Sequence, residues 1–185
     1  MLYTKKGDNG TTKTFGCDQR ISKSSIIAEA LGALDEANSF LGLARAKTAG
    51  TSFRIDSGET KFSDLILEVQ QNLFIIQAEV AGSTLTITKE KINKIENIVD
   101  EIEKVLPPIK SFFLSGATES SATFDFARTL ARRAERRVVA AKEEGKITVS
   151  AESLSYLNRL SSLLYALARI SGHLNGAEEI KPDYK

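Results

Sequence analysis

The stretch Phe126–Gly145, FARTLARRAERRVVAAKEEG, decides our expectation for the fold. Alanine, leucine, arginine and glutamate run through it, and neither glycine nor proline interrupts it before its last residue, a composition that favours a helix. Apolar Leu130, Ala134 and Val138 recur every fourth residue and give this helix a face that borders a core. The stretch therefore predicts an amphipathic helix that packs against other helices.

The same stretch carries a dense row of cations. Ten residues hold five arginines, at Arg128, Arg132, Arg133, Arg136 and Arg137. At about 3.6 residues per turn, three of them fall on one stripe and the other two lie beside it. Within the run only Glu135 offers compensating charge. A solvated basic face is one interpretation. We favour an anion-binding wall, because these cations are all arginine, whose guanidinium makes forked contacts with phosphate or carboxylate.

Length and composition indicate an ordinary globular protein. The 185 residues fit one domain, expected over residues 1–185, which can bury roughly 70% of its unfolded surface. A net charge of +1 argues against general attraction to nucleic acid or membrane. Cys17 is the single cysteine, which excludes an internal disulfide and a cysteine zinc cluster. No apolar run approaches the ~20 residues of a membrane span and no signal-peptide core is present, so we expect a cytoplasmic protein.

Apolar residues also show helical spacing elsewhere. The segments are residues 24–46, 62–81, the stretch from a Thr88 cap to Pro107–Pro108, and 151–174. Residues 47–60 are rich in glycine, serine and threonine and indicate a connecting loop, and no run alternates with a period of two. The sequence therefore predicts an all-α fold, a five-helix bundle with a four-helix-bundle-like core, followed by a charged tail at 177–185.

Residues 1–23, MLYTKKGDNGTTKTFGCDQRISK, suggest a ligand-binding loop ahead of the bundle. Glycines such as Gly7, Gly10 and Gly16 let a backbone approach a ligand, while threonine hydroxyls and lysine ammonium groups suit phosphate oxygens. The spacing of a Walker A loop is absent. A flexible polar arm remains the alternative interpretation.

The scarcity of histidine limits the chemistry. His173 is the only one, so a ferritin-like di-iron bundle, a histidine zinc site and histidine-based nucleophilic catalysis have no basis. An enzyme built from this chain would work by positioning and charge stabilisation. Displacement of a polyphosphate fits, because cations can neutralise the leaving group while the nucleophile brings its own electron pair.

Three stretches, in order along the chain, resemble the PduO-type ATP:cob(I)alamin adenosyltransferase family. They are YTKKGDNGTTKTFG followed by Arg20 and Lys23; GALDEANSFLG; and FFLSGATES…ARTLARRAERRVV with YLNRLSSLLYALAR. The sequence departs from the family pattern at Ser115 and Ala117, which replace proline and glycine, and at Ser162, which replaces an acid. The segment after Lys23 also lacks the family's Pro-Arg.

The resemblance implies a helical bundle that forms a homotrimer with an active site at each subunit interface. It implies transfer of the 5′-deoxyadenosyl group of ATP to the cobalt of a reduced corrinoid, cob(I)alamin, giving adenosylcobalamin and triphosphate. Mg2+ is the implied metal, with no ligand residues assigned to it. The implied partners are the small molecules ATP and reduced corrinoid. A corrinoid reductase is a further candidate partner, whereas we expect binding to neither nucleic acid nor a membrane.

The resemblance also implies roles for particular residues. The ATP loop would use Thr4, Lys5, Lys6, Gly7, Thr12, Lys13 and Lys23. The neighbouring subunit would face that loop with Arg132, Arg133, Glu135, Arg136 and Asn158. Asp35 and Arg128 match a pair that links subunits near the corrinoid, and together with Arg132 and Phe112 they form the expected catalytic set. Phe112 matches the aromatic that keeps the lower face of cobalt free of a ligand, although two adjacent phenylalanines, Phe112 and Phe113, usually lie in a core.

A non-enzymatic function is the alternative. In that hypothesis the helical bundle docks RNA or an acidic partner through its arginine helix. It gives the GDNGTT segment no role, and the near-neutral net charge supplies no long-range attraction to nucleic acid.

Overall fold

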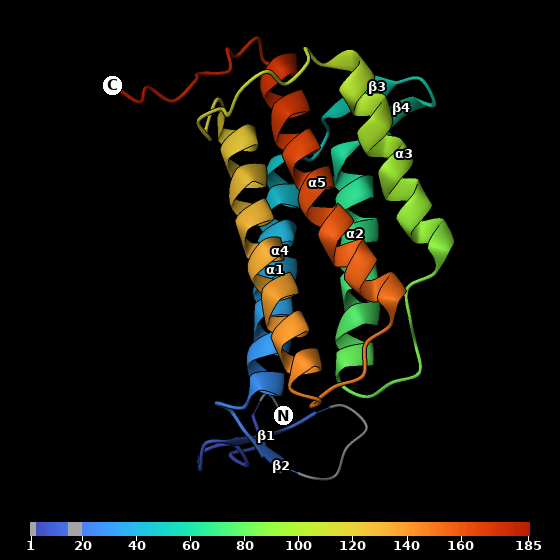
Figure 1. Cartoon of the computed structure of the whole chain (residues 1–185), viewed down its shortest axis with the longest axis vertical. Coiled ribbons are helices and arrows are strands. Elements are labelled where there is room, and N and C mark those ends of the chain that lie inside the picture. The colour runs from blue at the N-terminus through green and yellow to red at the C-terminus, as the bar shows by residue number, and fades with distance from the viewer. Residues whose placement is uncertain (1–2, 15–19) are drawn as a thin grey trace.

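Five helices make up most of the computed structural model, which describes residues 3–14 and 20–185. They are α1 (Ile26–Lys47), α2 (Phe62–Val80), α3 (Lys89–Val105), α4 (Glu119–Glu143) and α5 (Ala151–Leu174). The helices run side by side along one long axis, with α3 on the outer side of the bundle (Figure 1). α4 packs against both α1 and α5, α2 packs against α1, and α3 packs against α5. The predicted all-α five-helix bundle is confirmed. The predicted features at Gly16 and Cys17 lie outside the described residues.

The core forms where the apolar faces of these helices meet. α5 is central, and from Leu163 to Gly172 every residue except Tyr165 is buried. The two helices in contact, α1 and α4, both bury a row of alanines. These are Ala30, Ala33, Ala37 and Ala44 on α1, and Ala127, Ala131, Ala134 and Ala141 on α4. Small residues let the two backbones approach closely, and each buried leucine nearby contributes about 1.5–3 kcal/mol.

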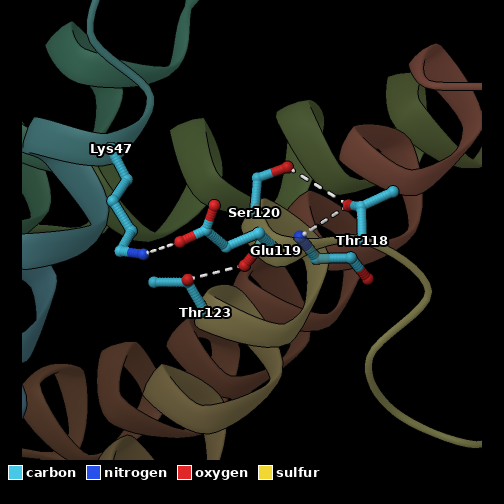
Figure 2. A network of polar contacts seen from close by, with 6 residues as sticks. Lys47, Thr118, Glu119, Ser120 and Thr123 are labelled. Carbon is cyan, nitrogen blue, oxygen red and sulfur yellow. Dashed lines mark hydrogen bonds and ion pairs between the residues drawn. The ribbon is translucent and has the colours of Figure 1, made fainter.

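α4 begins earlier than Phe126, where the quoted stretch starts, because residues 118–123 supply a complete helix start. The Thr118 hydroxyl accepts a hydrogen bond from the Ser121 N–H at 3.1 Å, and the Thr123 hydroxyl donates to the Glu119 carbonyl at 2.7 Å. Figure 2 shows Lys47 reaching from the end of α1 to the Glu119 carboxylate. The start of α4 is therefore fixed to the end of α1.

Two antiparallel hairpins accompany the helices. β1 (Thr11–Lys13) pairs with β2 (Arg20–Ser22), and β3 (Ser52–Ile55) pairs with β4 (Gly58–Lys61). The connecting loop predicted over residues 47–60 is therefore corrected: it lies between α1 and α2, but most of it forms the β3–β4 hairpin. In β3, Phe53 and Ile55 are buried while Arg54 between them is exposed, an alternation too short to be recognised in the sequence. Gly58 has a φ of 129°, which the tight turn before it requires.

The chain places its candidate ligand regions at opposite ends of the bundle. The β1–β2 hairpin lies at the end that carries the N-terminus, below α1 and the last turn of α4 (Figure 1). The α3–α4 connection and the C-terminal tail lie at the other end. In the described ranges no helix is both long and apolar enough to cross a bilayer.

Candidate functional site

The arginines of α4 differ in whether α1 neutralises them. Arg133 forms an ion pair with Glu36, and the Arg137 guanidinium lies 4.0 Å from the Glu29 carboxylate. Arg132 and Arg136 are exposed and, among the described residues, have no hydrogen-bond or ion-pair partner. Two cations of the row are thus available to an anion from outside the chain. From the sequence we expected charge compensation only from Glu135, because the α1 glutamates lie about a hundred residues earlier.

A polar chain joins α4 to α5 and α3 beside these arginines. The Asn158 side-chain amide donates to the Glu135 carboxylate at 3.0 Å. Arg159 donates to the side-chain Oδ1 of Asn158 at 2.8 Å and to the Glu96 carboxylate at 2.7 Å. Asn158 and Glu135, which the family resemblance assigned to the same site, are therefore in direct contact. Asn158 and Arg159 are exposed while Glu135 and Glu96 are half-buried, so these contacts orient side chains more than they stabilise the fold.

The predicted nucleotide loop has a defined conformation. The Lys23 ammonium donates to the Gly7 carbonyl at 2.9 Å, and Lys5 adopts a left-handed backbone with a φ of 58°. The side chains of Lys5, Lys6 and Lys13 are exposed. The described part of residues 1–23 therefore folds as a structured hairpin and loop, with its ammonium groups exposed at the surface.

A cavity of about 960 Å3 lies at the opposite end of the bundle. Its walls come from the α3–α4 connection, α4, α5 and the tail, and they include the predicted residues Phe112 and Arg128. Phe112 is 81% exposed, so its interpretation as a core residue is wrong for the single chain. Phe113 is half-buried and lies beneath the Arg169 guanidinium, 5.7 Å from ring centroid to Cζ. The two adjacent phenylalanines therefore differ in role.

Polar groups without partners line this cavity. The Arg128 Nε and the Ser111 hydroxyl are buried and, within the described chain, have no hydrogen-bond partner. Buried donors are usually satisfied, so both atoms mark places where a ligand can complete the hydrogen bonding. Arg128 thus combines its position on the arginine helix with an open donor at the cavity wall.

Asp125 is a further cavity residue that the sequence did not single out. Burial raises the pKa of its carboxyl, while a 3.2 Å hydrogen bond from the Gly116 N–H, the nearby Arg128 charge and the Ser115 hydroxyl act in the opposite direction. The hydrogen bonds tie the second turn of α4 to the turn that follows Phe112. Ser115, one of the departures from the family pattern, is therefore part of the cavity wall.

The charged tail closes one side of the cavity. Arg169, only 9% exposed, holds the Glu179 carboxylate through two nitrogens and donates to the Pro107 carbonyl at 2.9 Å. The Leu114 N–H donates to the Ile180 carbonyl at 2.8 Å. Ser162 and Arg169 are seven residues apart, which in a helix places them on the same face, so the sequence could have placed Arg169 at this cavity. Nothing in the sequence identified Glu179 as its partner.

The predicted residues do not all meet within one chain. The nucleotide loop lies at the hairpin end, whereas Phe112 lies at the cavity end (Figure 1). From Arg128 to the end of α4 alone the distance is about 22 Å at 1.5 Å per residue. Asp35 is exposed on α1 and, among the described residues, has neither an ion-pair nor a hydrogen-bond partner. The structure therefore brings Phe112 to Arg128 and Glu135 to Asn158, and leaves the loop apart from Phe112.

Known proteins resemble this chain over nearly its whole length. A family profile described as cobalamin adenosyltransferase matches residues 2–171. The corrinoid adenosyltransferase PduO of Citrobacter freundii is 38% identical over 179 residues, which cover 93% of this chain and 50% of that protein. The corrinoid adenosyltransferase of Bacillus subtilis (strain 168) is 36% identical over 187 residues, covering 97% of this chain and 91% of that protein. The chain thus spans about half the length of the first relative and most of the second.

Solved structures share the fold. A variant of the PduO-type ATP:corrinoid adenosyltransferase from Lactobacillus reuteri, complexed with cobalamin and ATP, superposes with a TM-score of 0.87 at 27% identity, covering 100% of this chain and 97% of that one. A second variant from the same organism, complexed with ATP, gives 0.85 at 26% identity, covering 98% and 100%. The profile match and these likenesses extend over all five helices, and the chain belongs to the cobalamin adenosyltransferase family.

Proposed function

We propose that this chain is an ATP:corrinoid adenosyltransferase, which moves the 5′-deoxyadenosyl group of ATP to the cobalt of cob(I)alamin and releases triphosphate. The observation that carries the proposal is the pair of exposed, unpartnered arginines on α4, Arg132 and Arg136, in a member of the cobalamin adenosyltransferase family. These cations can bind an anion without first breaking an ion pair within the described chain.

The chemistry needs little from the protein beyond positioning and charge. Co(I) supplies an electron pair to C5′ of ATP, the cobalt–carbon bond forms, and the C5′–oxygen bond breaks with its electrons leaving on triphosphate. Arg132 and Arg136 offset the negative charge of that leaving group, with Arg133 and the Glu135–Asn158 pair beside them. No general base is required, which agrees with the absence of histidine from this helix.

The cavity beside Phe112 supports binding of the corrinoid. A volume of about 960 Å3 with a few polar groups suits a large ligand with an apolar body. The unpartnered Arg128 Nε and Ser111 hydroxyl can bond to polar substituents of the ring. Phe112, exposed and without polar atoms, would cover the lower face of cobalt and exclude a ligand there.

We propose a homotrimer whose active sites are shared between neighbouring subunits, as the family resemblance implies. One chain holds the loop and Phe112 at opposite ends, and this separation supports a site in which a neighbouring chain brings its loop to the α4 arginines. Exposed apolar residues on α1, α2 and α4 support such an assembly. They are Leu43, Leu67, Phe74 and Phe126, the last in edge contact with Phe40 at a centroid distance of 4.8 Å. Asp35 and Arg128 would then pair across the interface.

Mg2+ would enter this site with ATP. The described residues contain no group of three or more histidine, cysteine, aspartate or glutamate side chains that could enclose a metal. Mg2+ in phosphate sites often uses one or two carboxylates together with substrate phosphates and water, so an all-protein cage is not required. The described residues therefore fit a metal carried by the triphosphate. We further propose that the enzyme works in the cytoplasm with a reductase that supplies Co(I).

One anaerobic assay tests the proposed function. The protein is mixed with ATP and a chemically reduced corrinoid, and adenosylcorrinoid is followed by its absorbance while triphosphate is measured separately. We expect both products in equal amounts, and a severe loss of rate in Arg132→Ala. Absence of the cobalt–carbon product, with ATP bound to the protein, would contradict the proposal and leave the docking of an acidic partner as the better hypothesis.

A further inference from the structure

Arg20 makes a set of contacts that the proposed chemistry does not use. It opens strand β2 and is half-buried. Its Nε donates to the Thr11 hydroxyl at 2.7 Å, and its Nη2 donates to the Thr11 carbonyl at 2.8 Å and also to the Lys6 carbonyl. One guanidinium thus joins strand β1 to the middle of the predicted nucleotide loop.

A second cation from the same segment binds the next carbonyl of the loop. Lys23 donates to the Gly7 carbonyl at 2.9 Å, while a Cβ on Gly7 would lie 3.1 Å from the Lys23 Nζ and 3.3 Å from the Thr11 carbonyl. Two successive carbonyls are therefore bound from β2 and the residue after it, and a side chain at Gly7 would crowd the Lys23 ammonium and the Thr11 carbonyl. The loop backbone is closely packed on its own hairpin.

The loop needs this support because its backbone is strained. Lys5 has a φ of 58°, a left-handed conformation that costs on the order of 1 kcal/mol for a residue with a side chain. A strained residue persists where its surroundings hold it, and the residue directly after Lys5 is the one bound by Arg20. A left-handed residue within such a turn also helps to form a backbone concavity that suits an anion.

We propose that Arg20 is a positioning residue for the nucleotide. It holds the Lys5–Gly7 backbone in the shape that receives the triphosphate, acting through the loop and not by contact with ATP. The inference rests on the proposed function only in taking ATP as the ligand. The fork of the guanidinium is essential to this role, because one planar group must reach the Thr11 side chain and two carbonyls at once.

The test compares Arg20→Lys with Arg20→Met. Lysine keeps the charge but has a single nitrogen in place of the planar fork that donates through both Nε and Nη2, and methionine removes both charge and fork. We expect both variants to bind ATP about tenfold or more weakly by calorimetry, in line with the loss of charge-assisted hydrogen bonds. The KM for corrinoid should stay within about twofold of the wild-type value, because the Arg20 side chain donates to Thr11 and the Lys6 carbonyl and, within the described chain, to none of the residues that line the cavity. Arg54→Lys, at an exposed arginine of the other hairpin, is the matched control.

A measurement without ATP separates positioning from a charge effect. Trypsin cleavage after Lys5 and Lys6, followed by mass spectrometry, should be severalfold faster in Arg20→Lys than in the wild type or in Arg54→Lys. Wild-type ATP affinity in Arg20→Lys would overturn the inference, because charge alone would then suffice. An equal rise in the KM for ATP and for corrinoid would also overturn it, since the effect would be general. If the wild type binds ATP but transfers no adenosyl group, the proposed function fails, and the ATP affinities still decide the role of Arg20.

Discussion

The two ends of the bundle differ in how their polar groups are satisfied. At the hairpin end the loop carbonyls are bound by Arg20 and Lys23, and lysine side chains remain exposed. At the cavity end the Arg128 Nε and the Ser111 hydroxyl are buried without partners in the described chain, next to an exposed Phe112. The first arrangement suits a small, highly charged ligand. The second suits a large ligand that covers apolar surface and completes a few hydrogen bonds.

α4 connects these two ends and repeats the contrast along its own length. Arg133 and Arg137 face glutamates of α1, whereas Arg132 and Arg136 are open to an anion. Residues of one type on one helix thus differ in their partners, which sequence spacing alone does not distinguish.

Loss of an open arginine should have the largest effect. Arg132→Ala removes a charged hydrogen bond to the leaving triphosphate, worth on the order of 2–4 kcal/mol in a transition state, so we expect a loss of about 10²–10³ in kcat. Arg137→Ala, the matched change at an arginine that faces Glu29, should lose less than about tenfold. Rates at saturating ATP, with size-exclusion chromatography to check assembly, measure both. Equal losses in the two variants would contradict the division of the row.

Mixed trimers test whether one active site combines the nucleotide loop of one chain with the α4 arginines of its neighbour. Arg132→Ala and a protein lacking residues 1–10 should each be nearly inactive alone. In trimers mixed at equal amounts, about a quarter of the interfaces would join an intact loop to an intact α4, so activity should recover to about a quarter of the wild-type value. Mass spectrometry under native conditions shows whether mixed trimers have formed. Mixed trimers without recovered activity would indicate that each site lies within a single chain.

Much of the fold could be predicted because helices carry a long periodic signal. The last helix was predicted at residues 151–174 and lies there, since apolar residues mark its face over six turns or so. The β3–β4 hairpin was missed because four residues per strand give too short an alternation. The early start of α4 was missed because its cap, Thr118, lies eight residues before Phe126 and directly after a glycine-containing turn.

The candidate site could be predicted less completely, for a different physical reason. The composition of the arginine row indicated an anion, but the ion pair of Arg133 with Glu36 joins residues 97 positions apart. The closure of the cavity by Arg169 and Glu179 likewise depends on how the tail folds back onto α5. Such contacts follow from helix packing, which a single sequence does not encode as a local pattern. The exposure of Phe112 has the same origin.

The adjacent phenylalanines offer a more moderate test at the cavity end. Phe112→Ala should leave the melting temperature nearly unchanged, because the side chain is 81% exposed. It should lower the rate roughly tenfold when Co(II) must be reduced on the enzyme, and less when Co(I) is supplied, since Phe112 would act by excluding an axial ligand. Phe113→Ala, which removes the ring beneath Arg169, should instead lower the melting temperature by several degrees. Equal rate losses for Phe112→Ala in the two assays would argue against the axial-ligand role.

The smallest expected effect concerns Asp125 and the pH dependence of stability. Burial raises the pKa of this carboxyl in the folded protein, so the folded state holds the proton more tightly than the unfolded chain. The contribution to stability is therefore present at pH values below the ordinary pKa and is lost as the pH rises through the raised pKa. At neutral pH the ionised carboxylate destabilises the fold, although Gly116, Arg128 and Ser115 reduce the effect. Asp125→Asn keeps an oxygen that can accept from the Gly116 N–H and removes the charge.

We expect Asp125→Asn to raise the melting temperature at neutral pH by on the order of 1 °C. Below the ordinary pKa of Asp125 the gain should disappear, because the wild-type carboxyl is then protonated as well. Melting temperatures measured across this range, with Asp100→Asn as the exposed control on α3, give the comparison. A variant less stable than the wild type at neutral pH would show that the attraction of Asp125 to Arg128 and to the Gly116 N–H outweighs its burial. The carboxylate would then strengthen the cavity wall in its charged form, and this end of the bundle would resemble the hairpin end, where charge already holds the backbone in place.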